Sequence, residues 1–187
     1  MNVIILAGGE GSRMGGVDKA AVRLDGRTLL TYLLESLGAR EHRVIVVSPR
    51  EIKGVATISE QPPLGGPVAG IAAGVQALPG DAEFTAVLAV DAPYSAEFLP
   101  TLVAAIGAAD VAVTRAADGW IQPLCALWRT DSLRRVLGQL GDVRDRPAKS
   151  LLRAAGVVVE VPGDGTEADY DTVEELSALG DVELPPA

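Results

Sequence analysis

A glycine-rich segment near the start of the chain has the residue types and spacing needed to bind phosphate. It follows the apolar run Val3–Leu6, which is typical of a buried strand. Glycine has no Cβ, so the backbone can bend sharply and turn several N–H groups toward one anion. Arg13 and Lys19 add positive charge. The segment is predicted to be a phosphate-binding loop rather than a surface turn; its glycines are Gly8, Gly9, Gly11, Gly15 and Gly16.

The loop fits neither of two common nucleotide-binding patterns. A P-loop has Lys directly after its last glycine, whereas Val17 and Asp18 precede Lys19 here. The dinucleotide fingerprint would require glycine at the position of Met14. The phosphate chemistry must therefore belong to another kind of loop.

Acidic residues at two other places could hold a metal ion. Asp91 follows the apolar run 84–90, and a carboxylate at the end of a central parallel strand points into the crevice where open α/β sheets bind ligands. Asp169 and Asp171 directly precede a predicted helix. Each has a simpler alternative, because Asp91 could open a turn before Pro93 and the acidic pair could stabilise the helix dipole.

Three motifs together resemble those of nucleotidyltransferases, and most closely the molybdenum cofactor guanylyltransferases of the MobA-like family. The first is Leu-Ala-Gly-Gly at 6–9, followed by Ser-Arg-Met-Gly-Gly-Val-Asp-Lys at 12–19. The second is Val-Asp-x-Pro-Tyr at 90–94, and the third is Asp-Thr-Val-Glu-Glu-Leu at 171–176. Gly-Pro-Val-Ala-Gly at 66–70 also resembles the family's second nucleotide-contacting segment. The resemblance covers almost the whole chain.

This resemblance implies Mg²⁺-dependent transfer of a nucleotide. The implied substrates are GTP and molybdopterin, whose phosphate would attack the α-phosphorus of GTP while pyrophosphate leaves. A phosphate nucleophile is already ionised, so no general base is needed, and the chain has a single histidine, His42, away from the motifs. The implied roles are catalysis for Arg13, Lys19 and Asp91; nucleotide binding for Leu6, Ala7, Gly8, Gly9, Gly16, Lys19, Gln61, Gly66 and Asp91; metal binding for Asp91 and Asp171, supported by Asp18 and Asp169; and acceptor binding for Gln122 and Pro123.

Two departures from the family pattern leave other substrates open. Val-Val-Ser at 46–48 stands where the family often has an Asn, and Gln61 follows Glu60 where the family often has Asp. Both places lie near the base and ribose in the family. Cytidylyl transfer to the same acceptor and a sugar-phosphate nucleotidyltransferase are therefore alternatives. A catalytically silent nucleotide-binding protein is a third, although the retained Lys19 and Asp91 argue against it.

Apolar runs and periodic patterns predict the elements that position these residues. Strands are expected at 3–6, 43–48, 55–59, 84–90, 110–115 and 122–128, with a last strand at 157–161. Helices are expected at 29–37, from 67, after 94, after 130, after 147 and at 172–179. The turn at 118–119 joins two strands that cannot be parallel. The predicted fold is one α/β domain over 1–187, a three-layer Rossmann-like nucleotidyltransferase fold whose mostly parallel sheet has an antiparallel element.

Local patterns add further expectations. Ser95 and Thr130 are predicted to cap helices, and Thr172 with Glu175 forms a predicted capping box. Trp120 is predicted to pack on the core rather than to shield an acceptor.

A mixed-charge segment follows the helix after 130. Arg144, Arg146 and Lys149 are predicted to form surface ion pairs with Asp142 and Asp145. The alternative is that these cations grip the phosphate of an acceptor.

Composition limits the classes of partner and location. Of 187 residues 48% are hydrophobic and only 4% aromatic, which suits an aliphatic α/β core. The net charge of −9 lies in the C-terminal part, because no Lys or Arg follows Arg153. Without a basic patch, nucleic acid is not an expected partner. One cysteine, Cys125, and no run approaching about 20 apolar residues predict a cytoplasmic protein without a membrane span. Transient contact with molybdenum cofactor insertion or target enzymes is the other expected partnership.

Overall fold

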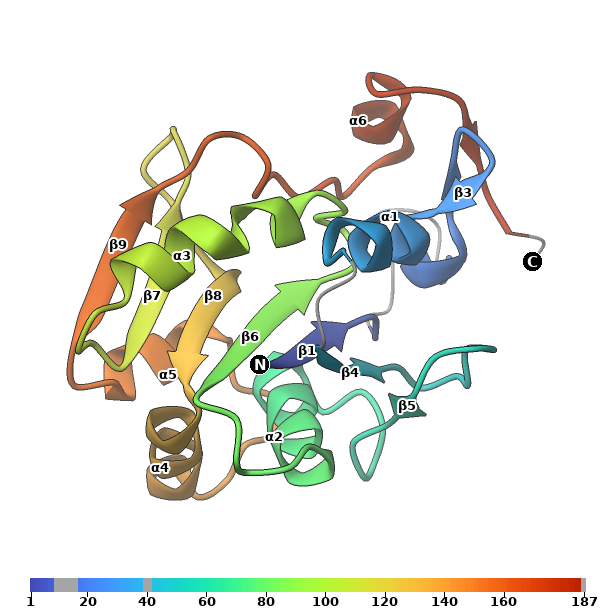
Figure 1. Cartoon of the computed structure of the whole chain (residues 1–187). Coiled ribbons are helices and arrows are strands. Elements are labelled where there is room, and N and C mark those ends of the chain that lie inside the picture. Colours follow the sequence, from blue (N-terminus) through green and yellow to red (C-terminus); the bar gives the residue numbers. More distant parts are fainter. Residues whose placement is uncertain (9–16, 39–41, 186–187) are drawn as a thin grey trace.

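The computed structural model of the chain describes residues 1–8, 17–38 and 42–185. Within them, a mixed sheet with the strand order β5-β4-β1-β6-β8-β7-β9 forms the middle of three layers (Figure 1). This confirms the predicted α/β architecture. Its strands are β1 (Asn2–Leu6), β4 (Arg43–Val47), β5 (Thr57–Ile58), β6 (Phe84–Ala89), β7 (Val111–Arg115), β8 (Ile121–Arg129) and β9 (Val158–Pro162).

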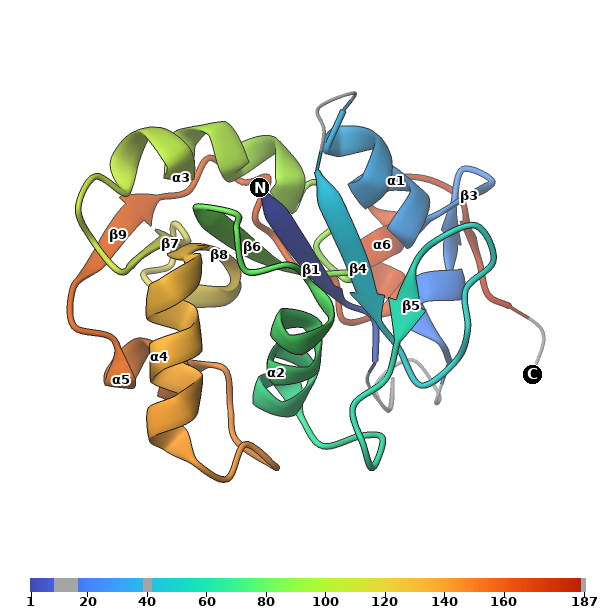
Figure 2. The same cartoon turned by 60° about the horizontal axis from the view of Figure 1, so that its bottom comes forward.

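Helices cover both faces of this sheet (Figures 1 and 2). One core cluster joins it to α1, α3 and α6, and a second joins it to α2, α4 and α5. No described helix is long and apolar enough to cross a membrane. The helices are α1 (Leu29–Ser36), α2 (Pro67–Ala77), α3 (Leu99–Ala105), α4 (Thr130–Leu140), α5 (Lys149–Ala154) and α6 (Val173–Ser177), with 3₁₀ turns η2 (Lys19–Ala21) and η3 (Ser95–Phe98).

Strand β1 lies inside the sheet, between β4 and β6, and both of its faces are buried. Val3 and Ile5 pack in the cluster with α1 and α3, whereas Ile4 and Leu6 pack in the cluster with α2 and α4. A strand covered on both faces needs apolar residues at every position. This requirement explains why the run was recognisable as a strand from sequence.

Strand pairing brings the chemistry-bearing segments to one edge of the sheet. Strand β1 pairs in parallel with β4 and β6, and Leu6 lies opposite both Val47 and Ala89. Strand β8 is antiparallel to β6 and β7, which confirms the predicted antiparallel element. Because β8 runs in the opposite direction, its first residues lie where the parallel strands end.

Strand β8 is irregular at this edge. Its register against β7 shifts after Val113, which leaves 123–125 without partners on β7. Pro123 has no N–H to donate to a neighbouring strand, so it suits such a bulge. The Thr114 hydroxyl donates to the Cys125 carbonyl over 3.0 Å. The bulge is thereby tied to β7 by a side chain instead of by the ladder.

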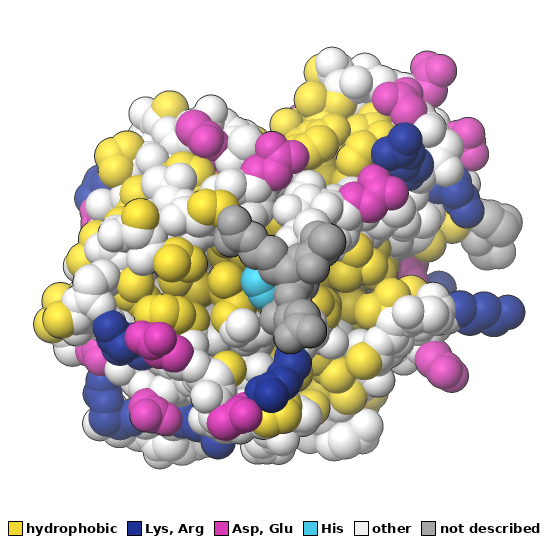
Figure 3. Space-filling view, viewed as in Figure 1, with side chains coloured by type: hydrophobic (Ala, Val, Ile, Leu, Met, Phe, Trp, Pro, Cys, Tyr) yellow, Lys and Arg dark blue, Asp and Glu magenta, His cyan; other side chains and the backbone are white. Residues whose placement is uncertain are grey.

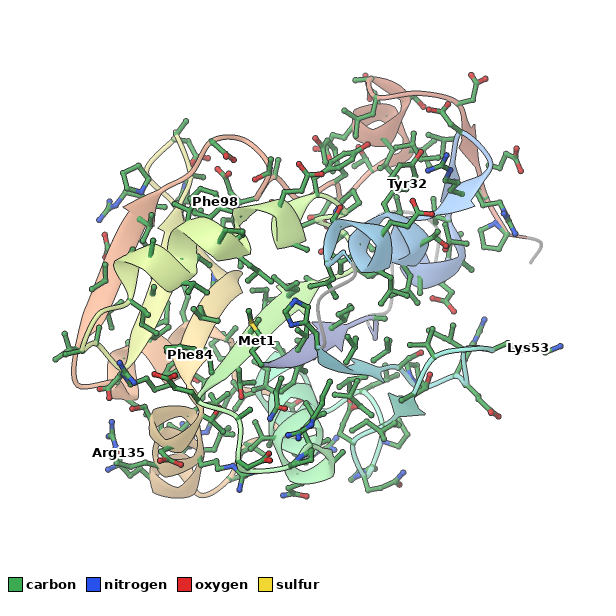
Figure 4. The ribbon with its side chains drawn as sticks, in the orientation of Figure 1. Met1, Tyr32, Lys53, Phe84, Phe98 and Arg135 are labelled. Carbon is green, nitrogen blue, oxygen red and sulfur yellow. The ribbon has the colours of Figure 1, made fainter. Side chains whose placement is uncertain are left out.

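A second, small sheet connects the C-terminal tail to the first third of the chain. It has the order β10-β2-β3, with β10 (Val182–Glu183), β2 (Arg23–Leu24) and β3 (Arg27–Thr28). The expectation that 157–161 is the last strand is therefore wrong, because strands of two residues carry no readable periodicity. Tyr32 of α1 lies beside this sheet (Figure 4) and donates to the Leu24 carbonyl over 3.2 Å. Its ring also meets Tyr94 edge-on, which joins the small sheet to the segment after β6.

Two predicted helix caps are wrong, and one is confirmed. Ser95 lies inside η3 and donates to the Ala92 carbonyl over 2.7 Å. Thr130 is the first residue of α4, and its hydroxyl bonds that of Thr85 at 2.9 Å. Both hydroxyls are buried and are satisfied by these partners. The capping box of Thr172 is present and begins α6.

The prediction that Trp120 packs on the core is wrong, because 64% of the residue is exposed. The hairpin holds it away from the sheet, and the Lys149 ammonium lies 4.5 Å from the centre of its ring.

The predicted ion pairs of the mixed-charge segment are also wrong among the residues that the structure describes. The Asp142 carboxylate accepts the backbone N–H of Arg144, while the Arg144 guanidinium donates to the Pro62 carbonyl. Arg146 donates to the Asp142 carbonyl. On the face shown in Figure 3, Lys and Arg side chains are interspersed with acidic ones rather than gathered in one patch.

Candidate functional site

The glycine-rich loop is described only at its two ends. Gly9, Arg13 and Gly16, to which the sequence gives roles, lie outside the described residues. At the first end, the Ala7 N–H donates to the Val47 carbonyl over 2.9 Å and continues the sheet by one residue. A Cβ on Gly8 would lie 3.2 Å from Pro49 Cδ. Glycine is therefore favoured where the chain leaves β1 beside the end of β4.

At the other end of the loop, Lys19 lies between two of the predicted carboxylates. Its Nζ is 3.0 Å from Asp91 Oδ2 and 2.6 Å from Asp171 Oδ1. The side chains of Lys19, Asp91 and Asp171 are 16%, 26% and 30% exposed. Lys19 comes from η2, Asp91 from the end of β6 and Asp171 from the tail before α6. The structure thus brings together three residues that are far apart in sequence.

Burial and charge compete in this cluster. Burial lowers the pKa of Lys19, but Asp91 and Asp171 outweigh it, so the net pKa lies above the usual value. Burial raises the pKa of Asp91 above its usual value, and Lys19 offsets part of this rise. The charges of Asp169 and Asp171 raise it further. The charge on Asp91 is therefore costly without a cation, which suits a residue that binds positive charge.

The two supporting acids occupy different places. Asp18 caps η2, since its Oδ1 accepts the Ala20 N–H over 3.0 Å, and so positions Lys19. Asp169 is exposed and accepts a hydrogen bond from Gln122 Nε2 over 3.3 Å. Asp169 is thereby linked to the start of β8 rather than to Lys19.

A pocket of about 290 Å³, the first pocket, opens beside this cluster. It lies at the ends of β1, β4 and β6 and at the start of α2. A Cβ on Gly70 would lie 3.1 Å from Leu6 Cδ2, so the small residue brings α2 close to β1. The lining of the first pocket includes the predicted nucleotide-binding residues Leu6, Gly8, Gly66 and Asp91.

One acid in the first pocket was not singled out from sequence. Glu60 lines the pocket, and its Oε1 accepts the Gly65 N–H over 3.0 Å. Gln61, which was predicted to bind the nucleotide, is exposed and does not line it. The predicted role had been assigned by position in a motif, which does not show which of two adjacent residues faces the pocket.

A second pocket, of about 310 Å³, lies on the other side of Asp91. Both predicted acceptor residues, Gln122 and Pro123, line it. The two pockets share Pro67, Ala89, Asp91 and Leu124. A molecule in each pocket would therefore meet its neighbour at Asp91. The other residues of the second pocket are Ala92, Cys125, Pro147, Ala148, Lys149, Glu167 and Asp169.

Glu167 was likewise missed from sequence. It is only 4% exposed, although it lies in a tail that is rich in acids. Burial of one carboxylate among many cannot be recognised from residue types, and the short segment 163–170 has no periodicity that would reveal it. Tertiary packing alone distinguishes Glu167 from Asp164, which is exposed.

Comparison with known proteins gives one family. The family described as the MobA-like NTP transferase domain matches residues 3–159. The molybdenum cofactor guanylyltransferase of Ectopseudomonas mendocina (strain ymp) is 36% identical over 186 residues, which cover 95% of this chain and 90% of the relative. That of Acidiphilium cryptum (strain JF-5) is 32% identical over 189 residues, covering 93% of this chain and 94% of the relative.

Solved structures have the same fold. Molybdopterin-guanine dinucleotide biosynthesis protein A from Archaeoglobus fulgidus superposes with a TM-score of 0.67 at 22% identity, covering 95% of this chain and 96% of that one. The 2-C-methyl-D-erythritol 4-phosphate cytidylyltransferase from Thermus thermophilus gives 0.68 at 20% identity, covering 95% of both chains. At these identities the likeness concerns the fold.

Proposed function

This chain belongs to the MobA-like NTP transferase family, and from that membership we propose that it transfers GMP from GTP to the phosphate of molybdopterin. The reaction forms a bond between a phosphate oxygen of molybdopterin and the α-phosphorus of GTP. The bond from the α-phosphorus to the bridging oxygen breaks, and pyrophosphate leaves with the electron pair. The product is the guanine dinucleotide form of the cofactor.

One observation carries this proposal, namely that two pockets meet at Asp91. Transfer of a nucleotidyl group requires the α-phosphate of one substrate to touch the phosphate of the other. We assign GTP to the first pocket, which adjoins the glycine-rich loop. Molybdopterin belongs in the second pocket, beside Gln122 and Pro123. Their phosphates would then meet beside Asp91 and Lys19.

Glu60 supports the choice of guanine over cytosine. A carboxylate accepts hydrogen bonds only, and guanine presents two adjacent N–H donors, at N1 and at its 2-amino group. Neutral cytosine presents one such donor, its 4-amino group, beside an acceptor. The Glu60 carboxylate uses one oxygen to accept the Gly65 N–H, and this bond also fixes its orientation in the first pocket.

Asp91 and Asp171 would hold a divalent metal ion, for which we propose Mg²⁺. Their carboxylates already converge on one positive charge, the Lys19 ammonium. The described residues contain no group of three or more His, Cys, Asp or Glu arranged to hold a metal. A pair of carboxylates fits Mg²⁺, which is commonly bound by one or two carboxylates together with substrate phosphates and water. When bound, the ion supplies positive charge to the phosphates.

Lys19 forms an ion pair with Asp91, which lines both pockets, so its ammonium would meet the substrate phosphates there. With its pKa raised, the amine keeps its proton at neutral pH and can donate hydrogen bonds to a phosphate. Positive charge aimed at the α-phosphate and the leaving pyrophosphate lowers the barrier to transfer. Arg13, by its place in the loop sequence, would act with it. Asp18, which caps η2, would position Lys19, and Asp169 would support the metal site.

The test is a Mg²⁺-dependent assay of pyrophosphate release with GTP, CTP, ATP and UTP, each with and without molybdopterin. We expect release only with GTP and molybdopterin together, and loss of release after chelation of the metal. Release with CTP would support cytidylyl transfer instead.

The variant Asp91→Asn should reduce the rate by about a hundredfold or more, whereas Asp81→Asn, at an exposed carboxylate before β6, should leave it unchanged.

A further inference from the structure

Glu167 is the one charged residue among the buried polar side chains that the structure describes. It lies between β9 and α6, in a segment that forms a wall of the second pocket. The mechanism of transfer does not use it, because the metal and phosphate sites lie at Asp91 and Lys19. Its burial therefore requires a separate explanation.

The protein provides few partners for this carboxylate. Within residues 1–8, 17–38 and 42–185, the hydrogen bond to the side chain is from the Gly165 N–H to Oε2, over 2.8 Å, and no Lys or Arg forms an ion pair with it. The backbone also makes room for it, since a Cβ on Gly163 would lie 2.2 Å from Oε1. A buried carboxylate with one N–H donor is costly. Such a group is well suited to bind donors that a ligand brings.

The rest of the second pocket indicates the shape of that ligand. Much of its lining is apolar, and Pro123, Leu124, Pro147 and Ala148 contribute to it. Apolar walls with one buried polar group are typical of sites that hold a flat ring and read its edge. The ligand should therefore be a flat heterocycle with adjacent N–H donors along one edge.

We propose that Glu167 selects the acceptor by accepting hydrogen bonds from the amino-pyrimidinone edge of its pterin ring. This edge carries two adjacent donors, the N3–H and the 2-amino group, which match the two oxygens of a carboxylate. The phosphate of the acceptor would then extend toward Asp91, which lines the same pocket. The proposal rests on the proposed function, because it takes molybdopterin as the acceptor.

Guanine carries the same kind of edge, so the test must separate the two substrates. In the variant Glu167→Gln the side chain keeps its size and can still accept the Gly165 N–H. We expect the KM for molybdopterin to rise about ten- to a hundredfold, because a charge-assisted hydrogen bond is lost. The KM for GTP should stay within about twofold of the wild-type value. A rise in the KM for GTP alone would overturn the proposal, as would no change in either. Asp164→Asn, in the same segment but exposed, is the matched control and should change neither.

A second measurement does not depend on any variant. Lumazine has an oxygen in place of the 2-amino group of pterin and so presents an acceptor where Glu167 requires a donor. We expect the wild-type protein to bind 6-hydroxymethylpterin at least about tenfold more tightly than 6-hydroxymethyllumazine in calorimetric titrations. Glu167→Gln should lose most of this preference. Equal binding of the two probes by the wild type would overturn the proposal.

The proposed function and the role of Glu167 can be disproved separately. If the wild-type protein releases no pyrophosphate from GTP and molybdopterin, the proposed function is wrong, and the role of Glu167 as a selector of that acceptor is wrong with it. If the wild type turns over normally and Glu167→Gln has an unchanged KM for molybdopterin, only the inference about Glu167 is wrong.

Discussion

One ammonium group holds the candidate site together at the scale of single residues. The Lys19 Nζ bonds two carboxylates that follow it by 72 and 152 residues in the sequence. Each carboxylate would otherwise repel the other, and Asp91 is the more buried of the two. Lys19 is therefore both a structural cation and the group that would meet the substrate phosphates.

Removal of Lys19 should separate these two roles. In Lys19→Ala we expect guanylyl transfer to fall by about a hundredfold or more, because charge on the transferred phosphate is no longer stabilised. We also expect Mg²⁺ to bind the nucleotide-free variant more tightly than wild type, since the ammonium no longer competes for Asp91 and Asp171. Isothermal titration with Mg²⁺ measures this.

Lys53→Ala is the control for that experiment, because Lys53 is an exposed lysine in the loop before β5. It should match wild type in both transfer and Mg²⁺ affinity. Mg²⁺ binding that is weaker in Lys19→Ala than in wild type would contradict the idea that ammonium and metal share the two carboxylates.

The sequence predicted these residues unevenly, and burial explains the difference. Lys19, Asp91 and Asp171 stand next to glycines, a strand end or a helix start, and such boundaries are visible in residue types. Glu60 and Glu167 carry no such signal. Only the folded chain directs each of these carboxylates into a pocket.

At the scale of elements, glycines in α2 set the distance between that helix and the sheet. A Cβ on Gly74 would lie 2.8 Å from Ile4 Cγ2, closer than atoms of this kind approach. Ile4 is fully buried on β1 and stiff at its branched Cβ, so it cannot easily move. Since α2 also carries Pro67 and Gly70 of the first pocket, this close packing positions the pocket as well.

Alanine at two helical glycines should therefore have opposite effects. We expect Gly74→Ala to lower the free energy of unfolding by about 1 kcal/mol, because an overpacking cost of about 1–3 kcal/mol exceeds a helix-propensity gain of about 1 kcal/mol. Gly138 in α4 is exposed, with no atom within 4 Å of a new Cβ. There the gain is unopposed, and Gly138→Ala should be stabilising by about 0.5–1 kcal/mol. Urea denaturation measures both, and a stabilised Gly74→Ala would show that the helix shifts freely.

Asp110 joins α4 to the segment between α5 and β9 through one carboxylate. Its Oδ1 accepts from Ser132 and Arg135 of α4 at 2.5 and 3.0 Å. Its Oδ2 accepts the N–H groups of Gly156 and Val157 at 2.7 and 3.0 Å, between α5 and β9. These hydrogen bonds, led by that from Ser132, lower the pKa of Asp110 from 3.8 to about 2.

This pKa predicts how acid weakens the fold. A carboxyl with a lowered pKa in the folded state stabilises it above pH 3.8, and the contribution is lost as the pH falls toward 2. At neutral pH it amounts to about 2 kcal/mol. Asp110→Asn should lower the free energy of unfolding by about this amount at pH 7 and by progressively less below pH 4. Glu51→Gln, at an exposed loop position, is the control. If Asp110→Asn lowers the free energy of unfolding equally at pH 7 and pH 2.5, this role of the Asp110 carboxylate is contradicted.

At the scale of the whole molecule, sequence predicted the main sheet and missed the small one. Strands such as β1 and β6 are buried on both faces and appear as unbroken apolar runs, so they could be recognised. The paired strands β10 and β2 have two residues each, and their pairing joins positions about 160 residues apart, as between Leu24 and Val182. Only tertiary packing specifies such contacts.

The two tryptophans report on opposite parts of this architecture. Trp128 on β8 is 1% exposed, whereas Trp120 on the hairpin is 64% exposed. We expect acrylamide to quench the fluorescence of Trp128→Phe, which retains Trp120, several times more strongly than that of Trp120→Phe. In denaturant the two variants should be quenched alike. Similar quenching of the native variants would place Trp120 against the core, as the sequence alone suggested.

The division of the site into two pockets affects how substrate preference can be inherited. Apart from the shared residues, the first pocket draws on residues 6–70, whereas the second draws on residues 92–169. Mutations that accumulate in the second half of the gene can therefore alter the acceptor while the nucleotide stays the same. A lineage that kept the first half unchanged could acquire a new acceptor without losing its nucleotide, because Asp91 is the point at which the two specificities meet.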